Sequence, residues 1–460
     1  MAGPIAKCVI FGGIVWATAC AGAAALPQST SATQPATASS QASEPNLDTL
    51  IAQLSNNSWK QRQAAQDLLV QLGAESVDRL SAVVRDSTDQ EAVARAQAAL
   101  RMIAENRLLG ASMITLNVEN APAEKVFQEL ARQAHTELVP EPPDLWTQKQ
   151  WPAATIHAER VEFWTVFRDA CRQVGVTPDQ GDNFKMRLAD AEDKKWILSP
   201  AVTTGPFLVW AECSERNLKH DFADPASAVD RTLTLTLHTD AEPKLRLIRD
   251  SAAVTIEEVV DDHGNSLLPS QQGAEPSISP SGDDGHFWDI ALQLEHPAAN
   301  IGTRIARLRG TLHFLAPVRT ETLEVDEIMK VRSVTRDLAG RRFLFRSAHR
   351  NGNGYEVKIT AYRDGLPEAD WQQIVNPHDF VRLADEKDRP IPFTGVSESD
   401  GGDRQITYTL QFESQTADKP NNAGRPSDVP GAPVKLVWDL PVETRALQAP
   451  FEFNNRLGLP

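Results

Sequence analysis

Two short runs of acidic and polar residues beside a glycine are the strongest candidates for metal chemistry. Residues 261–265 read DDHGN and residues 283–286 read DDGH, so each run places oxygen and imidazole ligands close together. A calcium loop of the EF-hand type also needs a glutamate at its twelfth position, and the first run lacks one. The first run is therefore predicted to be a charged hairpin turn, in which Gly264 and Asn265 adopt positive φ angles, and the second a solvated loop. Residues 351–354 (NGNG) are predicted to form a turn between two strands.

No combination of residues points to a catalytic centre or a cofactor site. The chain has no His-x-x-x-His or Cys-x-x-Cys pair for zinc, no Gly-x-Ser-x-Gly elbow and no glycine-rich phosphate loop. We therefore predict a protein that is not an enzyme and that holds no metal or cofactor. A hydrolase whose two carboxylates meet only in space stays open as an alternative, because such a pair leaves no local pattern in the sequence.

The composition argues against a nucleic-acid partner. The 460 residues include 46 Lys and Arg against 62 Asp and Glu, which gives a formal net charge of −16. Contacts to nucleic-acid phosphates need clustered positive charge instead. A chain of this length exceeds the size of one hydrophobic core, so about three or four domains are expected.

Residues 1–25 resemble an export signal. Lys7 is followed by an uncharged stretch of small and apolar residues, 8–25, which ends in three alanines. Cleavage after Ala25 is one interpretation. A second is a lipoprotein signal, in which a lipobox (ATAC) makes Cys20 the lipidated N-terminus, and a third is an uncleaved membrane anchor. All three predict a periplasmic or cell-surface protein, and the last two tether it to a membrane.

Residues 26–45 are predicted to be a disordered linker. They are rich in Ser, Thr, Ala, Gln and Pro, and Glu44 is their single charged residue. Such a segment buries too little apolar surface to offset its chain entropy. A flexible spacer after an export signal suits a protein that is tethered to a membrane.

Few cysteines remain beyond the export signal. Cys171 and Cys213 lie in different predicted domains. An exported chain with so few cysteines depends on hydrophobic cores and not on a disulfide framework. We predict two buried free thiols, with a disulfide between them as the alternative.

Residues 46–110 show the spacing of amphipathic helices, because apolar residues recur at intervals of three and four. The pattern repeats after 33 residues, where Arg62 and Ala65 recur as Arg95 and Ala98. This stretch resembles HEAT repeats, in which stacked helix pairs pack through small residues. The resemblance implies either a protein-docking surface or a structural spacer, and so few helix pairs would need support from the next domain.

Residues 111–198 contain an internal repeat with an offset of 40 residues. The sequence ITLNVENAPAEKVFQELARQAHTEL is followed by ATIHAERVEFWTVFRDACRQVGV, so that Thr115 aligns with Thr155. Each copy begins with alternating apolar residues and continues with helical spacing. Each therefore predicts a strand and a following helix, and the two helices are expected over 121–135 and 161–174.

This repeated unit resembles the short N-terminal domain of secretins and TonB-dependent receptors, the STN domain. In that family it is a small α+β domain that makes protein–protein contacts in the periplasm. The chain has neither a secretin pore domain nor a receptor's long series of membrane strands. The resemblance therefore implies contact with an envelope protein, and a role in secretion or iron uptake does not follow from it.

Residues 199–460 alternate apolar and polar side chains in short runs, which is typical of antiparallel sandwiches. An offset of 124 residues relates two halves and aligns Val259 with Leu383. We predict two tandem β-sandwich modules with one topology, residues 199–320 and 321–460. The predicted fold class is multi-domain α+β, with a short HEAT-like helical pair, an STN-like domain and two antiparallel sandwiches.

Tryptophans are the candidates for a binding surface. Trp146, Trp151 and Trp164 accompany the second strand–helix unit, where they either form an exposed patch or fill a small core. Sugar recognition by the β-modules would use exposed indoles, for which the candidates are Trp210, Trp288, Trp371 and Trp438, although the alternating strands place Trp288 and Trp438 in the core. The favoured function is a non-catalytic exported scaffold or protein-interaction protein of the bacterial cell envelope. The alternatives are a carbohydrate- or cell-wall-binding protein and an unrecognised hydrolase.

Overall fold

The computed structural model describes residues 46–179, 186–191, 194–219, 230–269, 276–281, 286–295, 300, 302–365, 380–400, 404–413 and 430–460. The predicted export signal with its Cys20 and the predicted linker lie outside these residues, as do Trp371 and residues 283–285 of the DDGH run. Within the described ranges, no helix has both the length and the apolar character that a membrane crossing requires.

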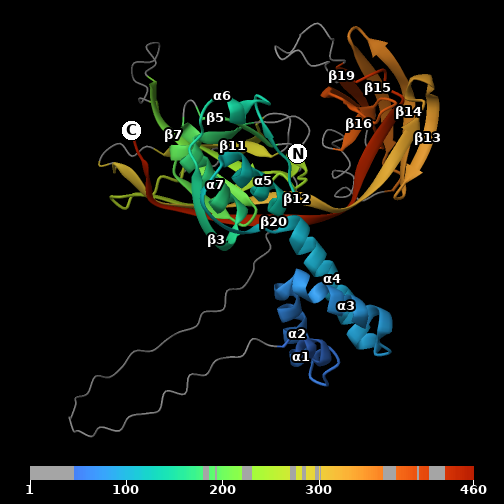
Figure 1. The fold of residues 1–460 in the computed structure, drawn as a ribbon. Coiled ribbons are helices and arrows are strands. Elements are labelled where there is room, and N and C mark those ends of the chain that lie inside the picture. The colour runs from blue at the N-terminus through green and yellow to red at the C-terminus, as the bar shows by residue number, and fades with distance from the viewer. Residues whose placement is uncertain are drawn as a thin grey trace, which may run out of the picture.

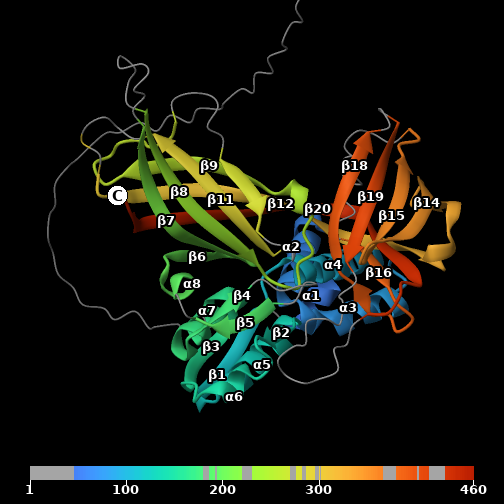
Figure 2. The same ribbon diagram turned by 90° about the horizontal axis from the view of Figure 1, so that it is seen from above.

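The chain folds into a multi-domain α+β protein, in agreement with the predicted class (Figure 1). Residues 47–109 form a helical arm that projects away from the other parts. Residues 113–198 form a mixed layer of strands and helices, and the remaining strands build two β-lobes that lie side by side in the view from above (Figure 2).

The arm consists of α1 (Leu47–Gln53), α2 (Trp59–Leu72), α3 (Ala74–Asp86) and α4 (Gln90–Leu109). Side-chain oxygens of Asn46 and Asp89 accept N–H groups at the starts of α1 and α4, which cap these helices. Gly73, at a φ angle of +58°, makes the tight junction between α2 and α3. The apolar spacing seen in the sequence builds the core of the arm, from Leu50, Leu54, Ala65, Leu69, Leu80, Ala92, Ala96, Ala99 and Ile103.

The mixed layer has the two predicted strand–helix units. Its elements are β1 (Met113–Ala121), α5 (Ala123–Ala134), β2 (Leu138–Pro140), α6 (Leu145–Gln148), β3 (Ala154–Glu162), α7 (Phe163–Val174), β4 (Val176–Asp179), β5 (Met186–Asp190) and α8 (Lys195–Leu198). Strands β1 and β3 pair antiparallel, and a second sheet has the order β2-β5-β4. The apolar faces of α5 and α7 share one core with these strands.

The 40-residue repeat is present in the hydrogen bonds of the mixed layer. The backbone N–H of Thr115 donates to Gln133 Oε1, and Gln133 Nε2 donates to the carbonyl of Thr115, both at 2.8 Å. The same pair of bonds joins Thr155 and Gln173, at 2.8 and 2.9 Å. In each unit a glutamine of the helix therefore fixes the strand that precedes it.

Three five-stranded sheets build the two lobes. The first sheet has the order β10-β11-β8-β7-β6, the second has β13-β14-β15-β19-β18, and a central sheet has β17-β16-β20-β12-β9. Neighbouring strands are antiparallel throughout. The strands are β6 (Ala201–Thr204), β7 (Phe207–Lys219), β8 (Asp230–Ala241), β9 (Ala253–Asp261), β10 (Ser277–Pro280), β11 (Phe287–Glu295), β12 (Arg304–Asp326), β13 (Arg332–Leu338), β14 (Arg341–Asn351), β15 (Gly354–Tyr362), β16 (Val381–Ala384), β17 (Pro390–Ile391), β18 (Phe393–Asp400), β19 (Gln405–Glu413) and β20 (Lys435–Gly458), with short 3-10 turns at Arg249–Ser251 and Ile328–Lys330.

The long strands β12 and β20 belong to both lobes, and Figure 1 shows them running from one lobe into the other. Leu312 and Phe453 lie in the core of the first lobe, whereas Leu323 and Leu436 lie in that of the second. The predicted boundary at residue 320 falls inside β12, between Ala316 of the first core and Leu323 of the second. Residues 321–460 do not form one separate module, however, because Phe451 and Phe453 lie in the core of the first lobe. A sequence period of two residues does not change where a strand passes from one sandwich to the next, so the alternation gave no sign of the crossing.

The predicted repeat of 124 residues is present in the lobes as one shared topology. Across the sheet, the order β6-β7-β8-β11-β10 of the first lobe corresponds to the order β13-β14-β15-β19-β18 of the second. The backbone N–H of Leu267 donates to the carbonyl of Val259, and the equivalent residues Ile391 and Leu383 pair in β17 and β16. The two lobes thus repeat one unit. The end of β12 packs in the second lobe, and the end of β20 packs in the first.

The two cysteines do not pair. Cys171 is buried in the mixed layer, as predicted, but Cys213 is exposed. A register shift in β7 between Ala211 and Cys213 explains the error. Simple alternation would place Cys213 on the buried face with Ala211, and the bulge turns it outward.

Candidate functional site

The DDHGN run forms a turn that is closed by its first carboxylate. Asp261 accepts the backbone N–H groups of His263, Asn265 and Gly302, at 2.7 to 3.0 Å. Gly264 has a φ angle of +86°, as predicted. One detail is wrong: the positive φ angles do not include Asn265, whose amide donates to Asp261 instead. Asp261 itself is buried. Burial raises the pKa of Asp261, but the hydrogen bonds from Asn265 and Gly302 lower it more, so the net pKa is depressed.

The same turn recurs 124 residues later. Asp385 accepts the backbone N–H groups of Lys387, Arg389 and Gly431, at 2.8 to 2.9 Å, and the Arg389 guanidinium at 2.6 Å. The Arg389 side chain and these N–H groups hold the pKa of Asp385 well below its usual range. Since both lobes use this carboxylate to close the corresponding turn, the run that resembled a metal site has a structural role.

His286 is buried, so its prediction as part of a solvated loop is wrong. Its carbonyl accepts the N–H of Ala241 at 2.8 Å, which places it at the start of β11 inside the first lobe. Burial, followed by the charge of Arg249, lowers its pKa to about 4. The NGNG run is a turn as predicted, with Asn351 opposite Gly354 and Gly352 at a φ angle of +57°.

The tryptophans of the mixed layer fill its core. Trp164 is fully buried. Trp146 is half-buried and stacks on Phe127 at 5.6 Å between ring centroids, and Trp151 packs edge-on against Trp146 at 5.7 Å. The core interpretation of these three residues is thus favoured over an exposed patch.

The tryptophans of the lobes give little support to sugar binding. Trp288 and Trp438 are buried in the two lobe cores, as expected from their alternating strands. Trp210 is half-buried, and its ring stacks on that of His238 at 4.1 Å between centroids. A sugar needs an indole face that is open to solvent, so the two buried tryptophans are removed from the candidates.

A buried carboxylate joins the mixed layer to the first lobe. Asp240, at the end of β8, accepts Nε1–H of Trp196 at 2.7 Å and Nε1–H of Trp210 at 3.3 Å. Trp196 belongs to α8, so its bond crosses between the two parts, whereas Trp210 lies in β7 of the same lobe as Asp240. Burial raises the pKa of Asp240 to about 6, although both tryptophan bonds act to lower it. No local sequence pattern marks Asp240, because its partners are 30 or more positions away.

A carboxylate–imidazole–carboxylate group lies next to Asp240. His238 Nδ1 lies 2.8 Å from Asp289 Oδ1, and its Nε2 lies 3.0 Å from Glu212 Oε2. Glu212 also accepts Lys195 Nζ at 3.1 Å, which links α8 to the lobe. Both ring nitrogens of His238 are engaged, so the group joins strands and has no free nitrogen for proton transfer to a substrate.

Acidic pH is expected to stabilise the native protein relative to an Asp240→Asn variant. The pKa of Asp240 is about 6 in the folded protein and about 3.9 in the unfolded chain. The contribution of Asp240 to the free energy of unfolding is therefore fully present below the unfolded pKa, and it is lost as the pH rises through 6. Between pH 7 and 4.5 the native protein should gain about 2 kcal/mol over the variant. Urea denaturation followed by tryptophan fluorescence measures this difference, and comparison of the two proteins cancels other groups such as His286. A difference that does not change with pH would refute the raised pKa.

An open groove of about 1280 Å³ separates the arm from the mixed layer. One wall is apolar and comes from the α2–α3 junction and from α4, and β1 and the end of α5 contribute to the other. Arg107, Arg160 and Lys244 line the groove, and Glu75 is the one acidic residue among its lining. The remaining lining residues are Val70, Gln71, Leu72, Gly73, Ala74, Val77, Leu100, Ile103, Ala104, Asn106, Leu108, Ala111, Ser112, Met113, Gln133 and His135.

Polar contacts fix the connection between α4 and β1, which borders this groove. Arg107 Nη2 lies 3.1 Å from His135 Nε2, and Lys244 Nζ donates to the carbonyl of Arg107 at 3.2 Å. Glu242 is buried and accepts the backbone N–H of Ser112 at 2.9 Å, and it lies 3.5 Å from Lys244 Nζ. The connection between α4 and β1 is thereby fixed to the first lobe.

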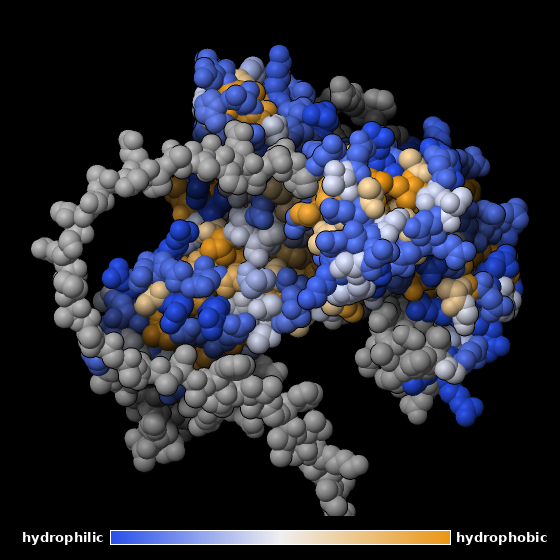
Figure 3. Space-filling model, turned by 90° about the horizontal axis from the view of Figure 1, so that it is seen from below, coloured by the Kyte–Doolittle hydropathy of each residue, from blue (hydrophilic) through white to orange (hydrophobic). Residues whose placement is uncertain are grey.

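Exposed apolar side chains concentrate beside the groove and on the arm. Among the described residues six large apolar side chains are exposed, and five of them lie between residues 59 and 113. Leu108 and Met113, at 39% and 46% exposure, line the groove itself. Figure 3 views the molecule from the side on which the arm projects and shows hydrophobic surface among hydrophilic areas. No sequence pattern distinguishes Leu108 and Met113 as exposed, because both also fit the apolar pattern of a buried face.

Comparisons with known proteins give no family. No family model and no curated protein matches the chain. A crystal structure of a conserved domain protein from Bacillus anthracis has 9% sequence identity over 57% of this chain and 93% of that chain, with a TM-score of 0.17. Similarity at this level carries no argument about fold or function.

Proposed function

We propose that this chain is a non-catalytic scaffold or interaction protein of the bacterial cell envelope, and that it docks a partner protein in the groove between the arm and the mixed layer. The observation that carries the proposal is the concentration of exposed apolar side chains over residues 59–113. Exposed apolar side chains that gather in one region of a protein mark interaction sites. Export by residues 1–25, with or without a lipidated Cys20, would bring the protein to the periplasm or the cell surface.

The partner is proposed to present apolar anchors together with acidic side chains. Leu108 and Met113 offer apolar contacts. Lys244 is paired with Glu242, but Arg107 and Arg160 still outnumber Glu75 among the other charged residues of the lining, which leaves an excess of positive charge. The chain as a whole has a net charge of −16, so this excess is local. Complementary charge at an interface rim steers association and sets orientation.

The arm and the mixed layer are proposed to be a HEAT-like helical pair and an STN-like domain. The paired helices that pack through Ala65 and Ala99 support the first proposal. The repeated Thr–Gln hydrogen bonds at an offset of 40 residues support the second. Both families make protein contacts, so both proposals agree with a docking role.

A photo-crosslinking amino acid at position 108 or 113 tests the site. We expect both positions to capture one and the same envelope protein in the producing cell, because both side chains line one groove. Position 198 serves as the control, since Leu198 is 73% exposed and does not line the groove. Capture of unrelated proteins at 108 and 113, or equal capture at 198, would contradict the proposal.

Binding of the captured protein is expected to weaken at least tenfold in the double variant Leu108→Glu with Met113→Glu, which corresponds to about 1.4 kcal/mol. The added carboxylates would have to lose water in an apolar contact. Leu68→Glu is the matched control, because Leu68 is an exposed leucine on the arm outside the groove. Calorimetric titration measures all three proteins, and an equal loss in the control would place the contact elsewhere on the arm.

A further inference from the structure

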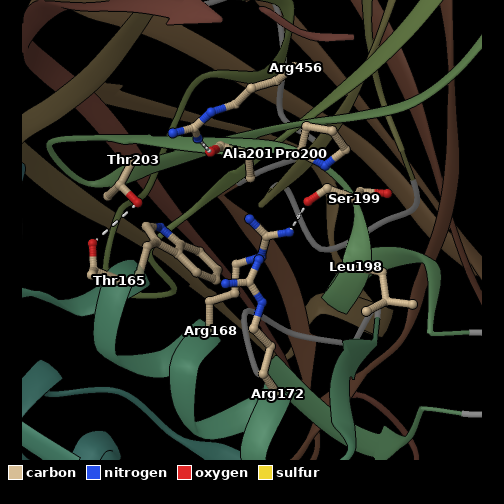
Figure 4. A pocket seen from close by; sticks show the side chains of 10 residues that line it. Thr165, Arg168, Arg172, Leu198, Ser199, Pro200, Ala201, Thr203 and Arg456 are labelled. Carbon is tan, nitrogen blue, oxygen red and sulfur yellow. Dashed lines mark hydrogen bonds between the residues drawn. The ribbon is translucent and has the colours of Figure 1, made fainter. Parts of the chain in front are cut away.

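A second cavity, of about 430 Å³, lies where the mixed layer meets the first lobe. Figure 4 shows Arg168 and Arg172 from α7 and Arg456 from β20 converging on the segment 198–201. Three of the ten lining residues are arginines and none is acidic. The other seven are Trp164, Thr165, Leu198, Ser199, Pro200, Ala201 and Thr203.

The arginines of this cavity have no direct ion-pair partner in the described part of the chain, although the buried Asp240 interacts with Arg168 through its charge. Arg168 and Arg172 are four residues apart on one helix, a spacing at which like charges repel. Arg168 is only 7% exposed, and burial followed by the charge of Arg172 lowers its pKa to about 10. In the part of the chain that the structure describes, neither these two residues nor Arg456 has a carboxylate within ion-pair distance, although acidic residues outnumber basic ones.

Backbone carbonyls fix the two helix arginines in place. Arg168 Nη2 donates to the carbonyls of Ser199 and Trp196, and Arg172 Nε donates to the carbonyl of Ile197 at 3.0 Å. These carbonyls stand at the end of α8, where the helix itself offers no donors. The contacts use one nitrogen of each guanidinium, so other N–H groups of Arg168 and Arg172 are left for a ligand. Arg168 Nε is buried and has no hydrogen-bond partner.

We propose that this cavity binds the phosphate or sulfate group of a small organic molecule. Guanidinium groups bind such oxyanions through paired N–H donors, and three of them from two elements can contact a tetrahedral group on several sides. The hydroxyls of Thr165, Thr203 and Ser199 line the same cavity and supply further donors. A bound dianion would also remove the repulsion between Arg168 and Arg172.

The size and one wall of the cavity favour an organic ester over the bare ion. A volume of about 430 Å³ lies within the range of small-molecule sites. Leu198 is 73% exposed at the cavity and is the one large exposed apolar side chain outside residues 59–113 among those described. It offers an apolar contact for the organic part, next to Pro200 and Ala201. This site is separate from the groove and does not depend on the proposed docking function.

Calorimetric titration of the purified protein tests the site, with phenyl phosphate, phenyl sulfate, inorganic phosphate, inorganic sulfate and benzoate as probes. We expect one of the two phenyl esters to bind at least tenfold more tightly than the inorganic ion of the same group and than benzoate. The double variant Arg172→Gln with Arg456→Gln should weaken that binding at least tenfold. Both residues are exposed, so the variant is expected to fold.

Arg101→Gln is the matched control, because it removes an exposed arginine from the arm and changes the net charge in the same direction. It should bind the ester as the native protein does. Binding that falls equally in this control would show a general charge effect and overturn the proposal. The proposal is also overturned if no probe binds, if the double variant binds as the native protein does, or if benzoate binds as tightly as the esters.

Discussion

Deletion of residues 446–460 is expected to unfold the first lobe and to leave the second lobe folded. The deleted residues form the end of β20, whose Phe451 and Phe453 are buried in the first lobe. Loss of a buried Phe side chain costs about 3–5 kcal/mol, so these two residues alone contribute about 6–10 kcal/mol. Since a domain is stable by only about 5–15 kcal/mol, the first lobe should not survive the deletion.

Hydrogen exchange measured by mass spectrometry separates the two lobes. Peptides from β8 and β11 should exchange as an unfolded chain does, whereas peptides from β14 and β15 should keep their protection. Two tandem modules divided at residue 320 would give the reverse result, because the deleted residues would then belong to the second module. Loss of protection in both lobes would show instead that they unfold as one cooperative unit.

Two substitutions on the same strand provide a matched test. Phe453→Ala should reduce protection mainly in the first lobe, and Leu436→Ala mainly in the second. Both side chains are buried on β20, and the expected costs are about 3–5 and 2–5 kcal/mol. Because both substitutions remove a buried side chain from β20, a difference between them reports which lobe each side chain stabilises. The same effect on both lobes from either substitution would contradict the assignment.

Local patterns were sufficient to predict the repeated units of this fold. The offset of 40 residues correctly paired Thr115 with Thr155, because each threonine makes the same local bonds to a helix of its own unit. The offset of 124 residues aligns Asp261 with Asp385, and both carboxylates close the corresponding turn of their lobe. Such features repeat in the sequence because each copy needs the same residue types at the same short spacing.

Contacts between distant segments were not predictable in this way. The crossing of β12 and β20 depends on the pairing of Arg304 with Gly458, more than 150 residues apart, and alternation carries no information about a strand's partner. The arginine cavity likewise joins α7 to Arg456 at the far end of the chain. In the sequence, Asp240 does not differ from the other polar residues of its alternating strand. Only its buried hydrogen bonds to Trp196 and Trp210 set it apart from them.

Substitution of Trp164 by alanine is expected to destabilise both the mixed layer and its junction with the first lobe. The indole packs on Phe163 and Phe167, at 5.2 and 5.6 Å between ring centroids, and its Nε1–H donates to the carbonyl of Pro206 at 3.0 Å. The loss of so large a buried ring costs about 3–5 kcal/mol. Because Pro206 lies between β6 and β7, the effect should extend into the lobe.

Hydrogen exchange in residues 201–211 shows whether the stability of the mixed layer and that of the first lobe are coupled. Trp164→Ala should increase exchange there and in α7, whereas Trp146→Ala should increase it only within the mixed layer, since Trp146 packs on Phe127. Trp164→Phe keeps much of the apolar contact and removes the bond to Pro206, so it should retain α7 while loosening residues 201–211. Unchanged exchange in 201–211 for all three variants would mean that the layer and the lobe are independent. Coupling would mean that the arginine cavity, whose walls come from both parts, keeps its shape only while Trp164 holds them together.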